Sequence, residues 1–467
     1  MENQRSLVKG LGLYGATSVV AGTMIGTAIF VVPSIMLAHV GTPSRVIAVW
    51  AFAGILSLFG ALGYAELGAA LPEAGGEYVY LYRAYGPGLG FMYGWTQFVV
   101  AKAASIAAIS TGFLLYLAYF FPSLSDVFWQ IQRSWAGINV TLKLTGLQIG
   151  ATSMILLLSM LNVVGVRRSG AVQTLFTVAK LLVLAVLIVL GLTLGHGSFE
   201  NFRQSATPLH GSLTAGFAAA TVSALWAYDG WNNLSMVAGE VQNPQRNMPA
   251  ALIVGSCLVL GVYLLVNAAY FYVLTPAQVL ATNRVAAEAA QKFLGHGGAT
   301  FVAVGVLIST FATLNGSILS GSRIPYAQAR DGLFPQVLAG LNPRFQTPAA
   351  AILAQACLAG VFAISGAYEA LYTKAIYSEW IFYALVTAGI VILRRRQPSL
   401  SRPYRTWGYP FVPITFVLIA VFILADTLVE RRSDAFWCLG LVGSGIPAYF
   451  IWRVWQRRSG RPVNSAQ

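Results

Sequence analysis

The sequence predicts an all-α polytopic membrane protein with twelve transmembrane helices. Of its 467 residues, 57% are hydrophobic and only 9% are charged, whereas an average soluble domain is about 25% charged. The apolar residues gather in long uncharged runs, and about 20 such residues let a helix cross the bilayer. Runs of this length lie at 14–38, 45–65, 91–120, 146–165, 171–195, 212–239, 249–274, 298–322, 347–365, 371–393, 410–430 and 435–456.

The basic residues predict how these helices are oriented. An even number of spans places both termini on the same side of the membrane. If that side is the cytoplasm, the inner loops and tails hold roughly twice as many lysines and arginines as the outer loops, which is the bias typical of cytoplasmic loops. We therefore expect a multi-pass protein of the cell (inner or plasma) membrane with two cytoplasmic termini.

The first run contains a stretch that does not suit a continuous membrane helix. Residues 21–33, AGTMIGTAIFVVP, carry two glycines and two threonines in the middle and a proline at the end. Each glycine weakens a helix by about 1 kcal/mol relative to alanine. We expect the helix to break near Ile25–Ala28, where the freed backbone groups would have to line a cavity. The alternative is an unbroken helix whose glycines pack closely against a neighbour.

The sixth run contains a similar interruption. Residues 224–240, ALWAYDGWNNLSMVAGE, place a glycine and several polar side chains at mid-depth. Interrupted spans at corresponding positions of two halves indicate an inverted-repeat transporter. The expected organisation is a cytoplasmic segment 1–13, helices 1–5 as the first repeat at 14–195, an outer loop 196–211, helices 6–10 as the second repeat at 212–393, a cytoplasmic loop with helices 11 and 12 at 394–456, and a cytoplasmic tail 457–467.

The two breaks predict a site for a zwitterionic small molecule, an amino acid. A half-helix that begins near Thr27 offers N–H groups and the positive end of its dipole to a carboxylate. Half-helices that end near Met24–Ile25 and Trp226–Ala227 offer C=O groups to an ammonium. The candidate binding residues are Met24, Ile25, Gly26, Thr27, Ala28, Trp226, Ala227, Tyr228 and Asp229. Trp226 is either a lid over the substrate or ordinary core packing.

Two lysines lie deep within apolar runs. Lys180 is about nine residues into the fifth run, and Lys102 is equally deep in the third. An ionisable side chain costs roughly 2.5–3.5 kcal/mol at the bilayer centre on insertion scales, so each is a functional candidate. The alternative for Lys180 is a structural role that joins helices. An ion pair between Lys102 and Asp229 is a further hypothesis.

Four motifs give the chain a family resemblance. TMIGTAIF in helix 1, PEAGGEYVYL after helix 2, AYDGWNN…GEVQNPQRNMP at helix 6 and SRIPYAQARDGLFP after helix 8 resemble the amino acid–polyamine–organocation superfamily. Within it, the chain is most similar to the L-type amino-acid transporters, which are light subunits of heteromeric transporters, and to their bacterial relatives. The resemblance implies a LeuT-like fold of 5+5 helices with helices 1 and 6 broken, and amino-acid transport that is often sodium-independent exchange.

The resemblance also implies roles for particular residues. The gating aromatic of the family falls on Trp226, and the family's G-S-G motif is Gly26-Thr27-Ala28 here, so its second glycine is replaced. Lys180 would stand where sodium-coupled relatives hold an ion, and it would bridge helix 1 carbonyls to hydroxyls of helix 8 such as Ser317 or Ser320. The loop 121–146 lacks the cysteine that joins animal light subunits to a heavy chain, so we expect no disulfide-linked partner.

Other function classes find little support in the sequence. The basic residues lie in short loops rather than on one soluble domain, which argues against nucleic-acid binding. Three cysteines and four scattered histidines offer no metal site, and neither HExxH nor GxSxG occurs, so we expect no cofactor and no enzyme. Sodium-independent exchange or uniport of neutral L-amino acids is the leading hypothesis. Proton-coupled symport of amino acids or polyamines and a non-transporting amino-acid sensor are the alternatives.

Overall fold

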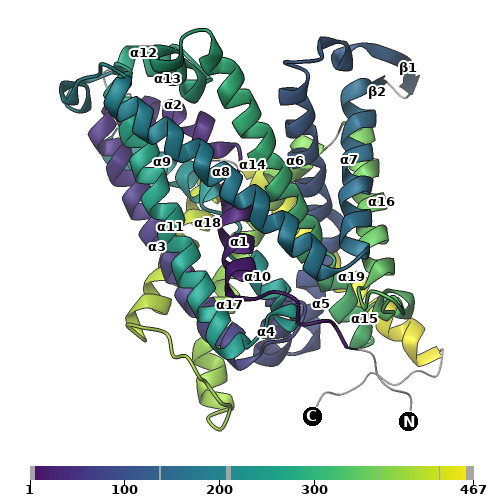
Figure 1. Ribbon diagram of the computed structural model, residues 1–467. Helices are drawn as coiled ribbons and strands as arrows, with labels where there is room; N and C mark the ends of the chain where they lie inside the picture. The colour runs from purple at the N-terminus through teal and green to yellow at the C-terminus, as the bar shows by residue number, and fades with distance from the viewer. Residues whose placement is uncertain (1–5, 136–137, 207–211, 367, 431, 459–467) are drawn as a thin grey trace.

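The computed structural model describes residues 6–135, 138–206, 212–366, 368–430 and 432–458, and within these ranges the chain is mainly helical (Figure 1). The elements are α1 (Leu13–Met24), α2 (Ala28–Val40), α3 (Pro43–Ala70), α4 (Glu77–Tyr85), α5 (Pro87–Thr96), the π-helical η1 (Gln97–Ala101), α6 (Lys102–Leu117), η2 (Pro122–Ser125), β1 (Val127–Trp135), β2 (Ile138–Thr145), α7 (Gly146–Val163), α8 (Val166–Leu194), η3 (Phe199–Phe202), α9 (Leu213–Ala227), α10 (Asn233–Met236), η4 (Ala238–Glu240), α11 (Pro244–Val273), α12 (Pro276–Leu280), α13 (Val285–Leu294), α14 (Gly297–Gly321), α15 (Arg323–Arg330), η5 (Gln336–Ala339), α16 (Ala349–Ser365), α17 (Tyr368–Arg396), α18 (Phe411–Glu430) and α19 (Arg432–Arg458).

The helices confirm a polytopic membrane protein. Among the described residues, seven helices are long and apolar enough to cross a bilayer, or eight if the bent pair α1 and α2 counts as one span. Shorter apolar helices lie at Leu213–Ala227, Ala349–Ser365 and Phe411–Ala425. Each of the twelve runs that the sequence predicts as a span coincides with helix.

The predicted break in the first run is present. Helix α1 ends at Met24, α2 begins at Ala28, and the two helices are bent by 44°. Pro33 lies inside α2 and does not end it. Ala28 begins α2 and is not among the residues with positive φ, so replacing the family's second glycine with alanine imposes no strain.

The sixth run is interrupted as well. Helix α9 ends at Ala227, a turn follows, and the short α10 begins at Asn233. Gly230 has a φ of 118°, a conformation that favours glycine, and a Cβ there would lie 3.0 Å from the backbone carbon of Thr23. The Thr23 hydroxyl donates a 2.8 Å hydrogen bond to the Gly230 carbonyl. The two breaks therefore touch each other, and glycine is needed at the point of contact.

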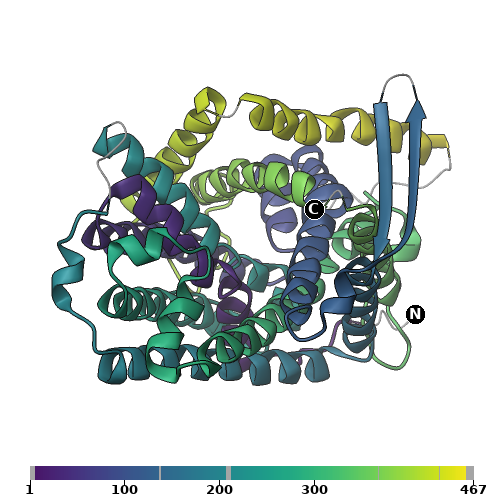
Figure 2. The same cartoon turned by 90° about the horizontal axis from the view of Figure 1, so that it is seen from above.

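Helix α1 lies inside the bundle, where it packs against α8, α11 and α14 (Figure 1). Helix α2 packs against α9, and α3 runs along α11. Helices α18 and α19 lie along one edge of the bundle when it is seen from above, and they contact α17 (Figure 2). The start of α1 and the end of α19 lie at the same end of the molecule (Figure 1).

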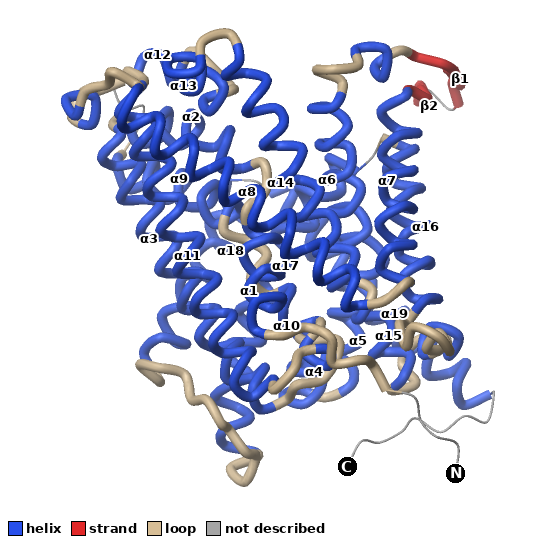
Figure 3. The backbone as a smooth tube through the Cα atoms, viewed as in Figure 1, coloured by secondary structure: helices blue, strands red, loops and turns tan. Residues whose placement is uncertain are grey.

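A β-hairpin at the opposite end was not predicted. Strands β1 and β2 pair antiparallel within the loop 121–146 and are the strands of the described chain (Figure 3). Thr145 then caps α7: its hydroxyl accepts from the Gln148 backbone N–H, and the Gln148 side chain accepts from the Thr145 backbone N–H. This capping box fixes where the hairpin ends and the next helix begins.

The end of the bundle near α4 is held by one fully buried ion pair and one partly buried ion pair. Arg323 and Glu240 form a two-pronged pair at 2.9 Å with both side chains fully buried. Arg394 pairs with Glu66 at 2.7 Å, and this contact ties α17 to α3. Because a buried charge is costly without a partner, these pairs fix how α15 and α17 dock on the rest of the bundle.

Candidate functional site

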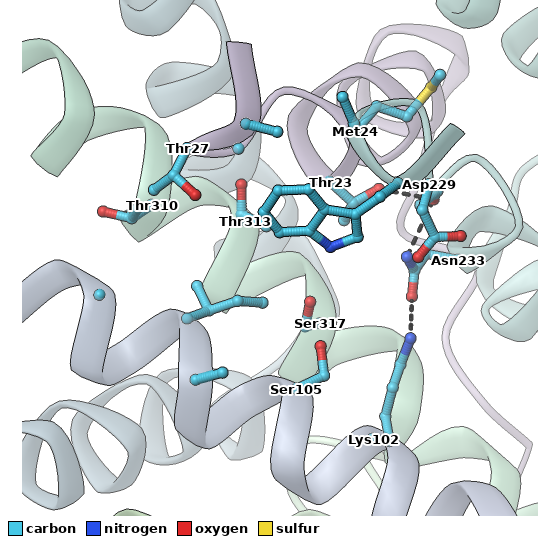
Figure 4. A pocket seen from close by; sticks show the side chains of 18 of the residues that line it. Thr23, Met24, Thr27, Lys102, Ser105, Asp229, Asn233, Thr310, Thr313 and Ser317 are labelled. Carbon is cyan, nitrogen blue, oxygen red and sulfur yellow. Dashed lines mark hydrogen bonds between the residues drawn. The ribbon is translucent and has the colours of Figure 1, made fainter. Parts of the chain in front are cut away.

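The two helix breaks open onto one cavity inside the bundle, which encloses about 160 Å³ (Figure 4). Its wall carries hydroxyl, amide, lysine and carboxyl groups beside small apolar side chains, a composition that suits a small polar solute. The lining residues are Thr23, Met24, Gly26, Thr27, Ala28, Lys102, Ser105, Ala108, Ile109, Gly112, Trp226, Ala227, Asp229, Gly230, Asn233, Thr310, Thr313, Ser317 and Glu379.

The start of α2 offers free backbone donors to this cavity. Among the described residues, the N–H groups of Gly26, Thr27 and Ala28 have no hydrogen-bond acceptor. The positive end of the α2 dipole lies at the same point. A Cβ built on Gly26 would meet no atom within 4 Å, so this backbone faces open space. Such a cluster of donors is suited to an anion such as a carboxylate.

The carbonyl ends of α1 and α9 are joined by a tyrosine. The Tyr263 hydroxyl of α11 lies 2.9 Å from the Met24 carbonyl and 3.0 Å from the Ala227 carbonyl. One hydroxyl carries one hydrogen, so it donates to one of these oxygens at a time. Each carbonyl oxygen also has a second lone pair. The Met24 and Ala227 carbonyls, which the sequence predicts to be unpaired, therefore share one hydroxyl donor. Both can still accept a hydrogen bond from an ammonium group.

Lys180 of α8 lies beneath the first break and is fully buried. Its ammonium donates to the carbonyls of Gly22 at 2.8 Å, Ile25 at 2.6 Å and Ser309 at 2.9 Å, and lies 3.4 Å from the Thr313 hydroxyl. The expected bridge from helix 1 to helix 8 therefore exists.

The expected partners of Lys180 on helix 8 were wrong. Ser309 and Thr313 contact the ammonium. Ser317 instead lines the cavity, and Ser320 donates to the Asn233 amide oxygen at 2.6 Å. Ser309, Thr313 and Ser317 are spaced four apart and lie on one side of α14, so what separates them is height along the helix: Lys180 meets the residues one and two turns before Ser317.

Lys102 and Asp229 do not form the ion pair considered from the sequence. Lys102 donates to the Asn233 amide oxygen at 2.7 Å, a contact seen beside Asp229 in Figure 4. Asp229 accepts from the Tyr383 hydroxyl at 2.6 Å, and Tyr383 also lies 3.2 Å from Glu379. Glu379 was missed, although a carboxyl group inside the apolar run 371–393 is a signal of function by the same rule that singled out the lysines.

Most of the predicted binding residues line the cavity. Met24, Gly26, Thr27, Ala28, Trp226, Ala227 and Asp229 do so. Two do not. The Ile25 carbonyl serves Lys180 and the Ser309 hydroxyl, and the Tyr228 ring is buried against Trp50 and Tyr263. Trp226 is 37% exposed, so it is not ordinary core packing.

A multi-pass helical protein with two interrupted helices around an internal polar cavity belongs to the class of small-solute transporters. Comparison with known proteins identifies the family. The family model described as "Amino acid permease" matches residues 11–444. The chain belongs to this family, so it is a transporter of amino acids and not an enzyme.

Relatives cover nearly the whole chain. The mouse (Mus musculus) b(0,+)-type amino acid transporter 1 is 33% identical over 98% of this chain and 91% of its own length. The serine/threonine exchanger SteT of Bacillus subtilis is 32% identical over 95% of this chain and 97% of its own. The human cystine/glutamate transporter is 30% identical over 97% and 87%, respectively.

Proposed function

We propose that this permease exchanges neutral L-amino acids across the cell membrane by alternating access, without sodium. The observation that carries the proposal is the convergence of two helix breaks on one cavity. Gly26, Thr27 and Ala28 supply N–H groups for the substrate carboxylate. The carbonyl ends of α1 and α9 supply acceptors for its ammonium. Trp226, at the end of α9, serves as the gate over the bound substrate.

Sodium independence rests on Lys180. Its ammonium takes the position between the α1 carbonyls and α14 where a cation would otherwise be bound. The proton-coupled alternative assigned the mobile proton to this lysine. Four surrounding oxygens accept from the ammonium or lie beside it, and such partners favour the charged form. We therefore propose that Lys180 is a fixed charge, with Ser309 and Thr313 as its partners.

The same proposal includes an architecture and an orientation. Twelve spans would form two inverted repeats of five helices, 14–195 and 212–393, with the last two helices outside the repeat. The packing of α18 and α19 at one edge supports this division. Both termini would be cytoplasmic, as the basic loops favour. The hairpin loop lacks a cysteine, so we expect the chain to work without a disulfide-linked heavy subunit.

Uptake into proteoliposomes tests the mode of transport. We expect internal amino acid to stimulate uptake of labelled neutral amino acid several-fold, and replacing sodium with potassium to leave the rate unchanged. Absence of this stimulation, with uptake that follows an imposed proton gradient, would favour proton-coupled symport. Binding without any flux would favour the sensor.

A further inference from the structure

The segment that joins α17 to α18 is strongly basic. Residues 394–411, RRRQPSLSRPYRTWGYPF, contain five arginines and no acidic residue. The segment lies at the same end of the molecule as the start of α1 (Figure 1). The contacts of the five arginines decide whether this charge is neutralised inside the protein or presented to its surroundings.

Two of the arginines hold the segment in its shape. Arg394 donates to both carboxylate oxygens of the buried Glu66, at 2.9 Å and 2.7 Å. The backbone N–H and the hydroxyl of Thr406 donate to the same carboxylate, each at 2.7 Å. Arg402 donates to three backbone carbonyls within residues 393–400, at 2.9–3.0 Å, and so closes the end of α17. The segment is therefore wrapped around one carboxylate, and its shape does not depend on the other three arginines.

Those three arginines, Arg395, Arg396 and Arg405, are exposed. In the part of the chain that the structure describes, none of them has a carboxylate within 4 Å. Arg396 donates one hydrogen bond, at 3.3 Å, to the Ala84 carbonyl, which is neutral. The anchored segment thus presents three positive charges that its neighbours do not neutralise.

The described carboxyl groups at this end of the bundle have other partners. Each accepts a hydrogen bond from an arginine or a tyrosine, so none is left over as a counter-ion for the segment. The contacts are Glu66 with Arg394, Glu73 with Arg83 and Arg330, Glu77 with Tyr64 and Tyr93, Glu240 with Arg323, and Asp331 with Tyr78. A counter-ion for the three exposed arginines must therefore come from outside this part of the protein.

Aromatic side chains indicate that the segment lies at the membrane surface. Trp407 is 64% exposed, and Phe411, the first residue of the apolar helix α18, is 77% exposed. Tryptophan is enriched where the hydrocarbon core meets the lipid headgroups. The last turn of α17 carries arginines on the other side of the segment. Because the segment is bracketed by the ends of two helices of the bundle, its exposed arginines lie at the level of the headgroups.

We propose that residues 394–411 form a binding site for the headgroup of an anionic phospholipid, in the cytoplasmic leaflet under the proposed orientation. Arg395, Arg396 and Arg405 supply the guanidinium groups, which donate paired N–H bonds to phosphate oxygens. Trp407 and Phe411 supply apolar surface for the part of the lipid below the headgroup. This apolar surface favours a lipid over a free phosphate ion. The site is independent of which amino acid the protein carries.

Native mass spectrometry of the purified protein in a neutral detergent tests the site. The probes are phosphatidylglycerol, which carries a net negative charge, and phosphatidylcholine, which has a phosphate but no net charge. One arginine near an anionic lipid surface contributes about fivefold in affinity. We expect phosphatidylglycerol to bind at least tenfold more tightly than phosphatidylcholine. Equal affinity for the two lipids would overturn the proposal.

Paired substitutions locate the effect. Arg395→Gln together with Arg405→Gln should weaken phosphatidylglycerol binding about tenfold or more. Arg167→Gln together with Arg168→Gln is the matched control, because it removes two exposed arginines at the start of α8 that also have no carboxylate within 4 Å in the described chain. These two lie in a stretch without tryptophan, and the control should stay within twofold of the wild type. Equal losses in the two double variants would show a general effect of surface charge and refute the site.

Two further measurements separate a lipid from a soluble anion. Trp407→Ser leaves the arginines in place and should weaken phosphatidylglycerol binding at least threefold, because the lipid loses apolar contact. Unchanged binding would show that the lipid does not lie against this segment. Glycerol 3-phosphate, added at matched ionic strength, should not displace phosphatidylglycerol at a tenfold molar excess. Displacement at equal concentration would identify the segment as a site for soluble phosphates and overturn the lipid proposal.

Discussion

Replacing Lys180 with methionine should loosen the first helix break. The ammonium donates to three buried carbonyls, at Gly22, Ile25 and Ser309. Hydrogen bonds to a charged group contribute about 1.5–3 kcal/mol each. Their sum overstates the effect, because burying an ammonium is itself costly. Methionine fills a similar volume, so the cavity left behind is small.

The hydroxyls nearby reduce the loss further. The Ser309 hydroxyl donates to the Ile25 carbonyl at 2.8 Å, and the Thr313 hydroxyl can donate to one of the remaining acceptors. The Ser309 carbonyl lies within α14 and keeps its backbone donor, so the loss falls on the Gly22 and Ile25 carbonyls at the end of α1, which keep only the weaker, neutral hydroxyl donors. We expect a net loss of about 2–4 kcal/mol of stability, together with exchange reduced at least tenfold, because the break that shapes the carboxylate site is no longer held.

Thermal unfolding in detergent and exchange in proteoliposomes measure these effects. Lys180→Met should lower the Tm by several degrees. Lys292→Met, on the exposed face of α13, removes the same charge and should change neither quantity. A Lys180→Met protein with wild-type Tm and wild-type exchange would refute the structural argument for this lysine.

Three further substitutions test other parts of the site. Gly26→Ala projects a methyl group into the cavity and should weaken substrate binding, measured by calorimetry, at least tenfold, or about 1.4 kcal/mol. Gly261→Ala is the control, because a Cβ built there also meets no atom within 4 Å. Equal substrate affinity in the two variants would contradict the site. Tyr263→Phe removes the hydroxyl shared by the carbonyl ends of α1 and α9 and should lower the free energy of unfolding by about 1–3 kcal/mol. An unchanged Tm would show that this hydroxyl does not stabilise the two helix ends. Glu240→Gln leaves buried Arg323 uncompensated and should destabilise by about 3–5 kcal/mol; a stable variant with a normal denaturation curve would contradict this.

Much of the membrane architecture could be predicted from the sequence because it depends on local composition. Long apolar runs fix the helices, and clustered glycine and polar residues fix the breaks at Ile25–Ala28 and Tyr228–Asn232. The deep position of Lys180 marked it as a functional candidate. In each case the signal is a residue that destabilises a helix in the middle of the membrane unless a neighbouring group compensates for it.

The individual side-chain contacts and the hairpin could not be predicted, because they depend on packing that the sequence does not specify. Which residues of α14 meet Lys180 is set by the position of that helix along its axis relative to α8, and a shift of one or two turns exchanges Ser317 and Ser320 for Thr313 and Ser309. Tyr228 lies in the predicted site segment but turns into the core, because Tyr263 and Trp50 pack around it. The hairpin β1–β2 lies in a loop that lacks the length to signal a separate domain.

The role of Glu379 also depends on contacts that cannot be read from the sequence. Its carboxyl group is visible in the run 371–393, yet its meaning depends on Tyr383 one turn away and on Asp229 from a distant segment. A single acidic residue in an apolar run could as well pair with a lysine. Only the arrangement of three side chains at the cavity wall turns it into a candidate binding group.

The central claim is that main-chain groups at two interrupted helices hold both charged ends of an amino acid. Its most direct test compares three ligands by calorimetry on the purified protein: the amino acid that stabilises it most in a thermal-shift screen of all twenty, the amine that lacks its carboxylate, and the acid that lacks its ammonium. We predict that the amino acid binds and that each analogue binds at least a hundredfold more weakly. An analogue that binds as tightly as the parent amino acid would contradict the claim.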